Sequence, residues 1–457
     1  MKHTKKYIVG FLFVAGAVFL GAVSSLGQEK RESSYSPVIE EPFDMVMAHD
    51  KSQKALLMKR QMDLLNERYD LSMKVTTEVT MSGGKPLPVG PTAKLKLALT
   101  WEKLARMSPE KIKEEDVFPY LPLPHPNHPV GGMLFTQIQI KQFPRLERFD
   151  LDFDIPEHFL PEYPPPLYLT THKDMGDVSQ GQVITVDNYY EIFNGILNPK
   201  QLEGLRLLLT QFPQQQFNAT ADRKSEKPSL GVACFDCHVN GHTSGATHLV
   251  GDIRPQSHRN RIETPSLRGV NIQRLFGSQR ALKTVEDFTE FEQRGAYFDG
   301  DHLTAAKKGI NVLERASQVH FMAEFQELLD FPPAPKLDIY GRLDPTKSTE
   351  SEKRGETIFF GKGKCESCHE PPYYTDNLMH DLQVERFYKS QTINGQYIRA
   401  EGPIKTFPLR GIKDSPPYLH DGRLLTLEDA VEFFNLVQQL NLSGQEKKDL
   451  TAFLRQL

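Results

Sequence analysis

The chain contains 457 residues, a length that indicates about two to four domains. Charged residues make up 25% and hydrophobic residues 39% of the sequence, which is enough apolar content for sizeable buried cores. The formal net charge of −4 at pH 7 argues against nucleic acid as a partner.

The beginning of the chain has the pattern of a secretory signal peptide. Three lysines precede an apolar run over residues 7–23, and Ser25 and Gly27 place small residues before a cleavage site. The run is shorter than the roughly 20 apolar residues of a bilayer span, which disfavours the alternative of an uncleaved anchor. We therefore expect a signal peptide over residues 1–27 and a mature protein that is exported, to the periplasm in a bacterium.

Residues 28–195 form an N-terminal extension that we expect to be largely irregular, with little β structure. Apolar residues at helical spacing predict a helix over about 48–70. Ser108 followed by Pro109 predicts the start of a short helix. Partial alternation of apolar residues predicts a strand over 133–140.

Three side chains of the extension could take part in redox or metal chemistry. His125 and His128 could reach a metal or a haem edge, but they lie in a proline-rich stretch that favours an alternative role as turn residues. Trp101 opens a short helix, and packing is the simpler interpretation than a role as a redox relay.

The strongest motif is C-x-x-C-H, which occurs twice and is the attachment signature of a c-type haem. Two thiols at this spacing can each form a thioether with one haem vinyl group, and the histidine that follows can bind the iron as proximal ligand. We therefore predict two covalently bound haem c groups. The predicted attachment points and proximal ligands are Cys234, Cys237 and His238 for the first haem, and Cys365, Cys368 and His369 for the second.

Two alternatives for the cysteines are a redox dithiol and an all-cysteine zinc site. Neither requires a histidine directly after both pairs, and the two pairs lie much farther apart in the chain than the pairs of a zinc ribbon. All 4 cysteines of the chain belong to these motifs.

Further residues could complete the haem sites. Each of three histidines after the first motif could be a distal iron ligand or could equally have a structural role: His242, His248 and His258. Three arginines are candidates for haem propionate partners, with packing as the alternative: Arg254, Arg268 and Arg410.

An internal repeat follows the two motifs. Residues 264–269 (TPSLRG) align with 406–411 (TFPLRG), and with the same offset 284–292 align with 426–434. Such self-similarity predicts two units that are built alike. We expect a mainly α fold, with two cytochrome c-like haem domains in tandem over residues 196–344 and 345–457.

The two C-x-x-C-H motifs, the repeated T-x-x-L-R-G-like segments and the sequence PYLHDG at 417–422 resemble the bacterial di-haem cytochrome c peroxidase superfamily, including the type that matures the quinone cofactor of methylamine dehydrogenase. The resemblance covers about residues 196–457. It implies that the first haem reacts with hydrogen peroxide and that the second passes electrons to it, from a small donor protein or from a protein substrate. The resemblance is also compatible with a homodimer and with calcium between the domains, as in some relatives.

The sequence departs from this family at the second haem. The family places a distal Met or Tyr on the helix after the H-D-G motif, and Phe434 occupies that position here. The second iron is then five-coordinate or takes another ligand, such as Met379 or His380. The family also has a tryptophan between the haems, where this chain has Phe276-Gly277-Ser278-Gln279-Arg280; Tyr297 and Phe298 are conceivable substitutes.

The repeat pairs Phe434 with Glu292 in the first unit. A carboxylate near an open haem face could act as general acid–base on peroxide, and the family uses a distal glutamate at its active haem. The alternative is a solvated glutamate on a helix. His420 of the H-D-G motif is expected to organise the haem pocket or, alternatively, to be a turn residue.

Together these features predict an exported di-haem c-type oxidoreductase that reacts with peroxide. One alternative is a periplasmic electron-transfer cytochrome without peroxidase activity. A second alternative is a scaffold that recruits a partner through its N-terminal region.

Overall fold

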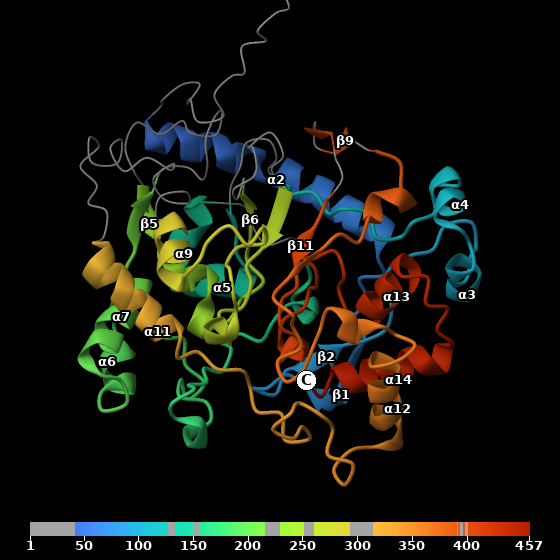
Figure 1. The fold of residues 1–457 in the computed structure, drawn as a ribbon. Helices are drawn as coiled ribbons and strands as arrows, with labels where there is room; N and C mark the ends of the chain where they lie inside the picture. The colour runs from blue at the N-terminus through green and yellow to red at the C-terminus, as the bar shows by residue number, and fades with distance from the viewer. Residues whose placement is uncertain are drawn as a thin grey trace, which may run out of the picture.

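The computed structural model describes residues 42–126, 133–149, 155–214, 229–250, 260–292, 314–390, 392–393, 396–397 and 401–457. Several predictions from the sequence concern positions outside these residues: the signal peptide over 1–27, His128, Arg254, His258, Tyr297 and Phe298. Helices dominate the described residues and the strands are short, so the mainly α prediction is confirmed (Figure 1).

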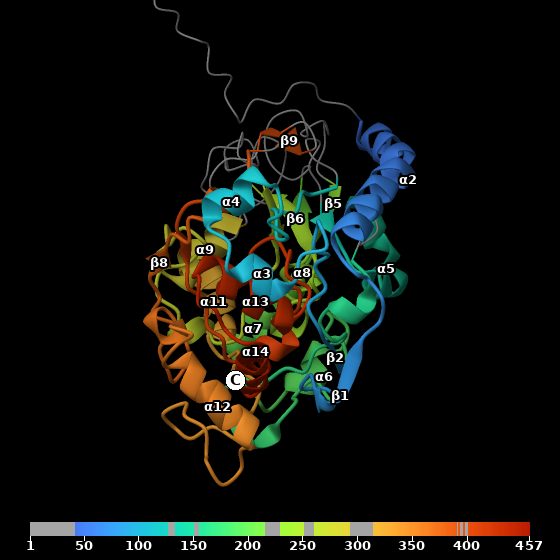
Figure 2. The same ribbon diagram turned by 90° about the vertical axis from the view of Figure 1, so that its right-hand side faces the viewer.

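The N-terminal region is built from helices that are joined by long irregular segments. Its helices are α2 (Phe43–Arg68), α3 (Trp101–Ala105), α4 (Pro109–Glu114), α5 (Gln137–Gln142) and α6 (Tyr189–Phe193), with short 3₁₀ turns η1 (Pro144–Phe149), η2 (Glu157–Phe159) and η3 (Lys173–Met175). Its strands are β1 (Val75–Thr80), β2 (Pro86–Pro88) and β3 (Met133–Leu134). Helix α2 runs along one edge of the molecule (Figure 2).

Two predicted helices of this region are confirmed and the predicted strand is wrong. Helix α2 covers the region expected around 48–70, and Ser108 caps α4 by accepting a hydrogen bond from the backbone amide of Lys111. Over 133–140 only β3 is extended, because Thr136 caps helix α5 by accepting from the amide of Gln139. An N-cap hydroxyl satisfies an otherwise orphaned helix donor, which outweighs a weak alternating pattern.

The segment that carries the first motif contains both helices and small strands. Its elements are α7 (Pro199–Leu209), β4 (Phe212–Gln214), β5 (Ser229–Val232), α8 (Cys234–Cys237), η5 (Val239–Gly241), β6 (Thr247–Val250), β7 (Asn260–Glu263), η7 (Val270–Ile272), α9 (Val285–Glu292), the π-turn η9 (Arg315–Val319) and α11 (His320–Gln326). Strand β6 pairs with β7 and also with β3, so this small antiparallel sheet joins the first motif's segment to the N-terminal region.

The segment that carries the second motif likewise combines helices with short strands. Its elements are α12 (Glu350–Phe359), η10 (Cys365–Ser367), β8 (Met379–His380), η11 (Val384–Phe387), β9 (Thr392–Ile393), β10 (Gln396–Tyr397), β11 (Ile404–Lys405), η12 (Ile412–Asp414), α13 (Leu427–Val437) and α14 (Gly444–Leu454). Strand β11 pairs antiparallel with β8.

The sequence repeat extends to the backbone. Antiparallel bridges join Phe276 to Leu282 and Tyr418 to Leu424, at the same offset that relates the aligned sequence segments. Gly269 and Gly411 both have a φ of 72°, and each precedes a 3₁₀ turn. Because a positive φ disfavours residues with a Cβ, this shared geometry explains the glycine at the end of both aligned segments.

Each half also contains a crossing of its first and last helix. Helix α7 packs on α11 in one half and α12 on α14 in the other, and the two pairs lie at opposite ends of the molecule (Figure 1). A glycine lies at each crossing: a Cβ on Gly204 would lie 1.9 Å from the carbonyl oxygen of Phe321, and one on Gly355 would lie 1.9 Å from that of Asp449. The helices are therefore closer together than any other residue would allow.

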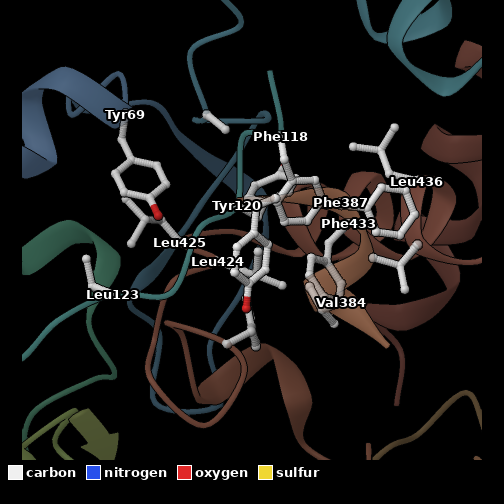
Figure 3. Close-up of a cluster of buried hydrophobic side chains, with 14 of the residues drawn as sticks. Tyr69, Phe118, Tyr120, Leu123, Val384, Phe387, Leu424, Leu425, Phe433 and Leu436 are labelled. Carbon is white, nitrogen blue, oxygen red and sulfur yellow. The ribbon is translucent and has the colours of Figure 1, made fainter. Parts of the chain in front are cut away.

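The largest buried cluster joins the N-terminal region to the second half of the chain. Phe118 and Tyr120 from the N-terminal region pack against Phe387 and Phe433 (Figure 3), with ring centroids 5.3 Å apart for Phe118–Phe387 and 5.9 Å apart for Tyr120–Phe433. Trp101 stacks on Tyr120 and so has a packing contact. Since the extension and the second half share one core, removing residues 28–195 would expose much of that core. The domain boundaries remain predictions.

Candidate functional site

The first motif places His238 in an orientation that suits iron binding. Helix α8 spans Cys234 to Cys237, and His238 is its C-cap residue. The Nδ1 atom of His238 lies 2.9 Å from the carbonyl oxygen of Pro265. A carbonyl can only accept, so Nδ1 carries the proton and Nε2 carries the lone pair that a metal needs. Burial lowers the pKa of His238 to about 4, so the ring is neutral at neutral pH.

The second motif repeats this arrangement. The Nδ1 atom of His369 lies 2.8 Å from the carbonyl oxygen of Tyr374, which again directs the proton to Nδ1 and the lone pair to Nε2. Burial lowers the pKa of His369. The Tyr374 hydroxyl donates to the carbonyl of Gly341, which fixes the residue that orients His369. Hydrogen bonds of this kind set the tautomer and the ring direction of metal-binding histidines.

The environment of the thiols fits thioether formation better than thiolate chemistry. The four cysteines are half-buried and form no disulfide. Burial raises the pKa of Cys365 to about 12 and also raises that of Cys368. Zinc ligation and dithiol exchange both use the thiolate, whereas a thioether sulfur is uncharged and tolerates an apolar surrounding. Cys234 and Cys365 pack against two different hydrophobic clusters, which disfavours one shared zinc site.

Side chains of the N-terminal region form hydrogen bonds with the first C-x-x-C-H motif. Arg145 forms a bidentate ion pair with Asp236, with Nη1–Oδ2 at 2.8 Å and Nη2–Oδ1 at 2.6 Å. The side-chain amide of Gln139 donates to the carbonyl of Asp236, and Gln139 accepts from Ser244 at 3.0 Å. Asp236 also accepts from the amide of Ala233 at the start of α8. The second residue between the two cysteines therefore anchors the motif to a distant part of the chain.

We expect Arg145→Ala to lower the free energy of unfolding by about 2 kcal/mol and to reduce haem content, since it removes charge-assisted hydrogen bonds from a nearly buried carboxylate. Chemical denaturation and the haem-to-protein ratio measure both effects. Arg206→Ala is the matched control: its bidentate partner Glu203 is 36% exposed, whereas Asp236 is 8% exposed. The control should cost less than about 1 kcal/mol, as exposed pairs do. Equal effects of the two variants would show that Asp236 needs no partner.

The structure favours a structural role for His242. Its Nε2 atom lies 3.0 Å from the carbonyl oxygen of Asp414 and therefore donates, while its Nδ1 atom accepts from the hydroxyl of Ser266 at 2.8 Å. Both ring nitrogens are thus engaged with protein groups, and the contact with Asp414 joins the two halves of the chain. Burial lowers the pKa of His242 to about 3. His248 lies in β6, and its side chain lies outside the described residues.

Two of the arginines predicted to bind propionates are engaged with protein groups. Arg268 is buried and pairs with Asp414 at 2.9 Å, and its other amino group donates to the carbonyl of Pro166. Arg410 donates to the carbonyls of Leu457 and Pro332. These contacts favour the packing alternative for both.

The residues predicted on the distal side are distributed over several elements. Glu292 is the last residue of α9 and is half-buried; its role as acid–base remains a prediction. Phe434 lies on α13, with its ring 5.3 Å from that of Phe433. The carbonyl of His420 accepts from the amide of Glu263 at 2.8 Å, so the H-D-G motif lies at the junction of the two halves. Its organising role also remains a prediction.

One group of potential metal ligands lies beside the second motif. Atoms of Cys368, Asp376 and His380 lie within 4.8 Å of one another, and His380 Nε2 lies 2.6 Å from Asp376 Oδ2. Among the described residues no other group of this kind is found. Its sulfur and imidazole donors differ from the all-oxygen set that calcium takes. Calcium therefore remains a prediction without an assigned site.

The family of this chain follows from its similarity to known proteins. No protein-family model matches the chain. The cytochrome-c peroxidase IdrP2 of Denitromonas iodatirespirans is 30% identical over 281 residues, which are 50% of this chain and 76% of that protein. The chain belongs to the di-haem cytochrome c peroxidase family.

Two further di-haem cytochrome c peroxidase relatives agree with this membership. The methylamine utilization protein MauG of Methylophilus methylotrophus is 28% identical over 291 residues. The aligned region is 57% of this chain and 84% of that protein. The cytochrome c551 peroxidase of Nitrosomonas europaea is 29% identical over 143 residues. The aligned region is 30% of this chain and 42% of that protein. As a member of the di-haem cytochrome c peroxidase family, this chain is a peroxidase-type haem oxidoreductase, and its cofactor is haem c.

Within the described residues of this family member, we find no helix with both the length and the apolar character of a membrane span.

Proposed function

We propose that this chain is an exported di-haem enzyme that reduces hydrogen peroxide with electrons from a donor protein or from a side chain of a protein substrate. Its two haem domains lie in tandem. The residues that hold the covalent haem c groups are Cys234, Cys237 and His238 in the first and Cys365, Cys368 and His369 in the second.

The observation that carries this proposal is the pair of histidine-to-carbonyl hydrogen bonds. His238 and His369 belong to different halves of the chain, yet each donates from Nδ1 to a backbone carbonyl at 2.9 Å and 2.8 Å respectively. In both cases the remaining ring nitrogen carries a lone pair, and burial keeps the ring neutral. This is the state in which imidazole binds iron.

The reaction that we propose is the reduction of one hydrogen peroxide by two electrons and two protons to two waters. Haem iron supplies the one-electron redox chemistry when it is bound. Glu292 takes a proton from one peroxide oxygen and delivers it to the other. The first haem is the proposed site of peroxide reduction, because its half offers a carboxylate where the second half has Phe434.

The remaining parts of the proposal concern the surroundings of the enzyme. Residues 1–27 are a signal peptide, and the mature protein works in the periplasm or otherwise outside the cytoplasm. Hydrogen peroxide and a small electron-donor protein or protein substrate are its partners. Calcium binding and a homodimer follow from the family resemblance alone.

Absorption and EPR spectra of the full mature chain, produced with its haems, test this proposal. We expect two covalent haems per chain in a pyridine haemochrome assay, and a high-spin signal from one haem in the half-reduced state that disappears when peroxide is added. If both haems are low-spin in every redox state and peroxide leaves the spectra unchanged, the chain is an electron carrier and the peroxidase proposal is wrong.

A further inference from the structure

Lys405 is a buried cation between the two halves of the chain. It belongs to β11 of the second half, and its backbone amide donates to the carbonyl of Ser278 in the first half at 3.0 Å. Its side chain passes between the rings of Phe276 and Phe407, with Nζ 5.6 Å and 5.3 Å from their centroids. The residue is only 3% exposed.

Lys405 has no acidic partner in the part of the chain that the structure describes. Its Nζ atom donates to the side-chain oxygen of Gln273 at 2.9 Å, and Gln273 is neutral. Burial lowers the pKa of Lys405 to about 8, so the ammonium is still the main form at pH 7. A buried charge without a counter-ion is costly, and proteins almost always pair such a group.

A second cation lies next to it. Arg280 is half-buried and close enough that its charge contributes to the lowered pKa of Lys405. The Nε atom of Arg280 is buried and makes no hydrogen bond to any described residue. No ion pair of its guanidinium is found among the described residues either. Lys405 and Arg280 are therefore two cations near the same junction, and no carboxylate of the described residues pairs with either of them.

We propose that Lys405 and Arg280 form a carboxylate-binding site at this junction and pair with haem propionates. This inference rests on the proposed function, since the propionates are the anionic groups that a bound haem carries. Arg suits a carboxylate because its donors match the two oxygens, and Lys supplies a point charge. One cation comes from each half of the chain, so the site would also couple the haem to the packing of the two halves.

Midpoint potentials of the two haems in Lys405→Met and Arg280→Gln variants test this site. Removing a cation leaves a propionate charge uncompensated, which stabilises the ferric state that carries the extra positive charge. We expect the ferric-to-ferrous ratio of one haem to rise about tenfold at a fixed potential, which is a fall in its midpoint of about 59 mV for a one-electron couple. The same haem should respond in both variants, and its spectrum identifies whether it is the first or the second.

Lys405→Arg keeps the charge and should keep the potential close to that of the wild type. Lys85→Met is the control for damage to packing: Lys85 donates to three backbone carbonyls of residues 157–161 and should leave both potentials unchanged. Unchanged potentials in Lys405→Met and Arg280→Gln, with two haems bound, would overturn this inference alone. A wild-type chain without covalent haem would overturn the proposed function and this inference together.

Discussion

Replacing His238 by glycine is expected to lower the rate of the reaction with peroxide by more than about 100-fold, since losing an outer-shell partner of a metal ligand alone costs 10–100-fold. The variant keeps Cys234 and Cys237, so the first haem should remain attached to the chain. The orienting bond from Nδ1 to the Pro265 carbonyl and the Nε2 lone pair are lost. Stopped-flow absorption in the half-reduced state measures the rate.

The corresponding change in the second half should act differently. His369→Gly should preserve a single reaction of the pre-reduced protein with peroxide, because the first haem keeps its ligand. It should abolish steady-state turnover with a donor protein, because electrons no longer enter through the second haem. This contrast distinguishes the proposed division of labour from two equivalent haems, for which both variants would lose the same steps.

Two controls make the His238 result specific. Added imidazole should restore part of the activity of His238→Gly, because it can occupy the vacated position, and a merely unfolded variant would not respond. His320→Gln removes a histidine that is 43% exposed and pairs with Glu286 and Glu324. This variant should react with peroxide as the wild type does. Full activity in His238→Gly would mean that another residue is the proximal ligand.

Local sequence signals predicted the parts of the protein that depend on neighbours in the chain. The C-x-x-C-H motifs and the helix start at Ser108 involve contacts over a few residues, and the cap at Ser108 is present in the structure. The repeat was also readable, because the turn residue Gly269 and its counterpart Gly411 are constrained by backbone conformation rather than by distant contacts.

Contacts between distant segments could not be predicted in this way. Asp236 reads as one variable residue between two cysteines, but its partner Arg145 lies 91 positions away. Residue type alone does not show whether an arginine is already paired within the protein, and the structure shows Arg268 paired with Asp414. The sequence does not indicate that Lys405 is buried, because its burial arises only when the two halves pack together.

The glycines at the helix crossings were equally invisible in the sequence, and they give the largest expected effect on stability. Alanine has a higher helix propensity than glycine by about 0.5–1 kcal/mol, so Gly355→Ala should stabilise an isolated α12. In the folded protein the added Cβ would lie 1.9 Å from the carbonyl oxygen of Asp449, on the backbone of α14. Backbone atoms cannot rotate away, so the two helices must separate.

We therefore expect Gly355→Ala to lower the free energy of unfolding by about 2 kcal/mol or more, as overpacking of a close interface does. Gly204→Ala should do the same at the crossing of α7 and α11, where the obstacle is the carbonyl oxygen of Phe321. Chemical denaturation, followed by far-UV circular dichroism, measures both. Because each crossing belongs to the half that carries one C-x-x-C-H motif, each variant should also loosen one haem more than the other.

Gly444→Ala is the matched control. Gly444 is the first residue of α14, has no positive φ, and a Cβ there would meet nothing within 4 Å. Its replacement should be neutral or stabilising by up to about 1 kcal/mol through the entropy of the unfolded chain. If Gly355→Ala and Gly204→Ala were as stable as Gly444→Ala, the helices would not cross at these glycines. The duplication would then rest on the turns and aligned segments alone, and not on a shared helix packing.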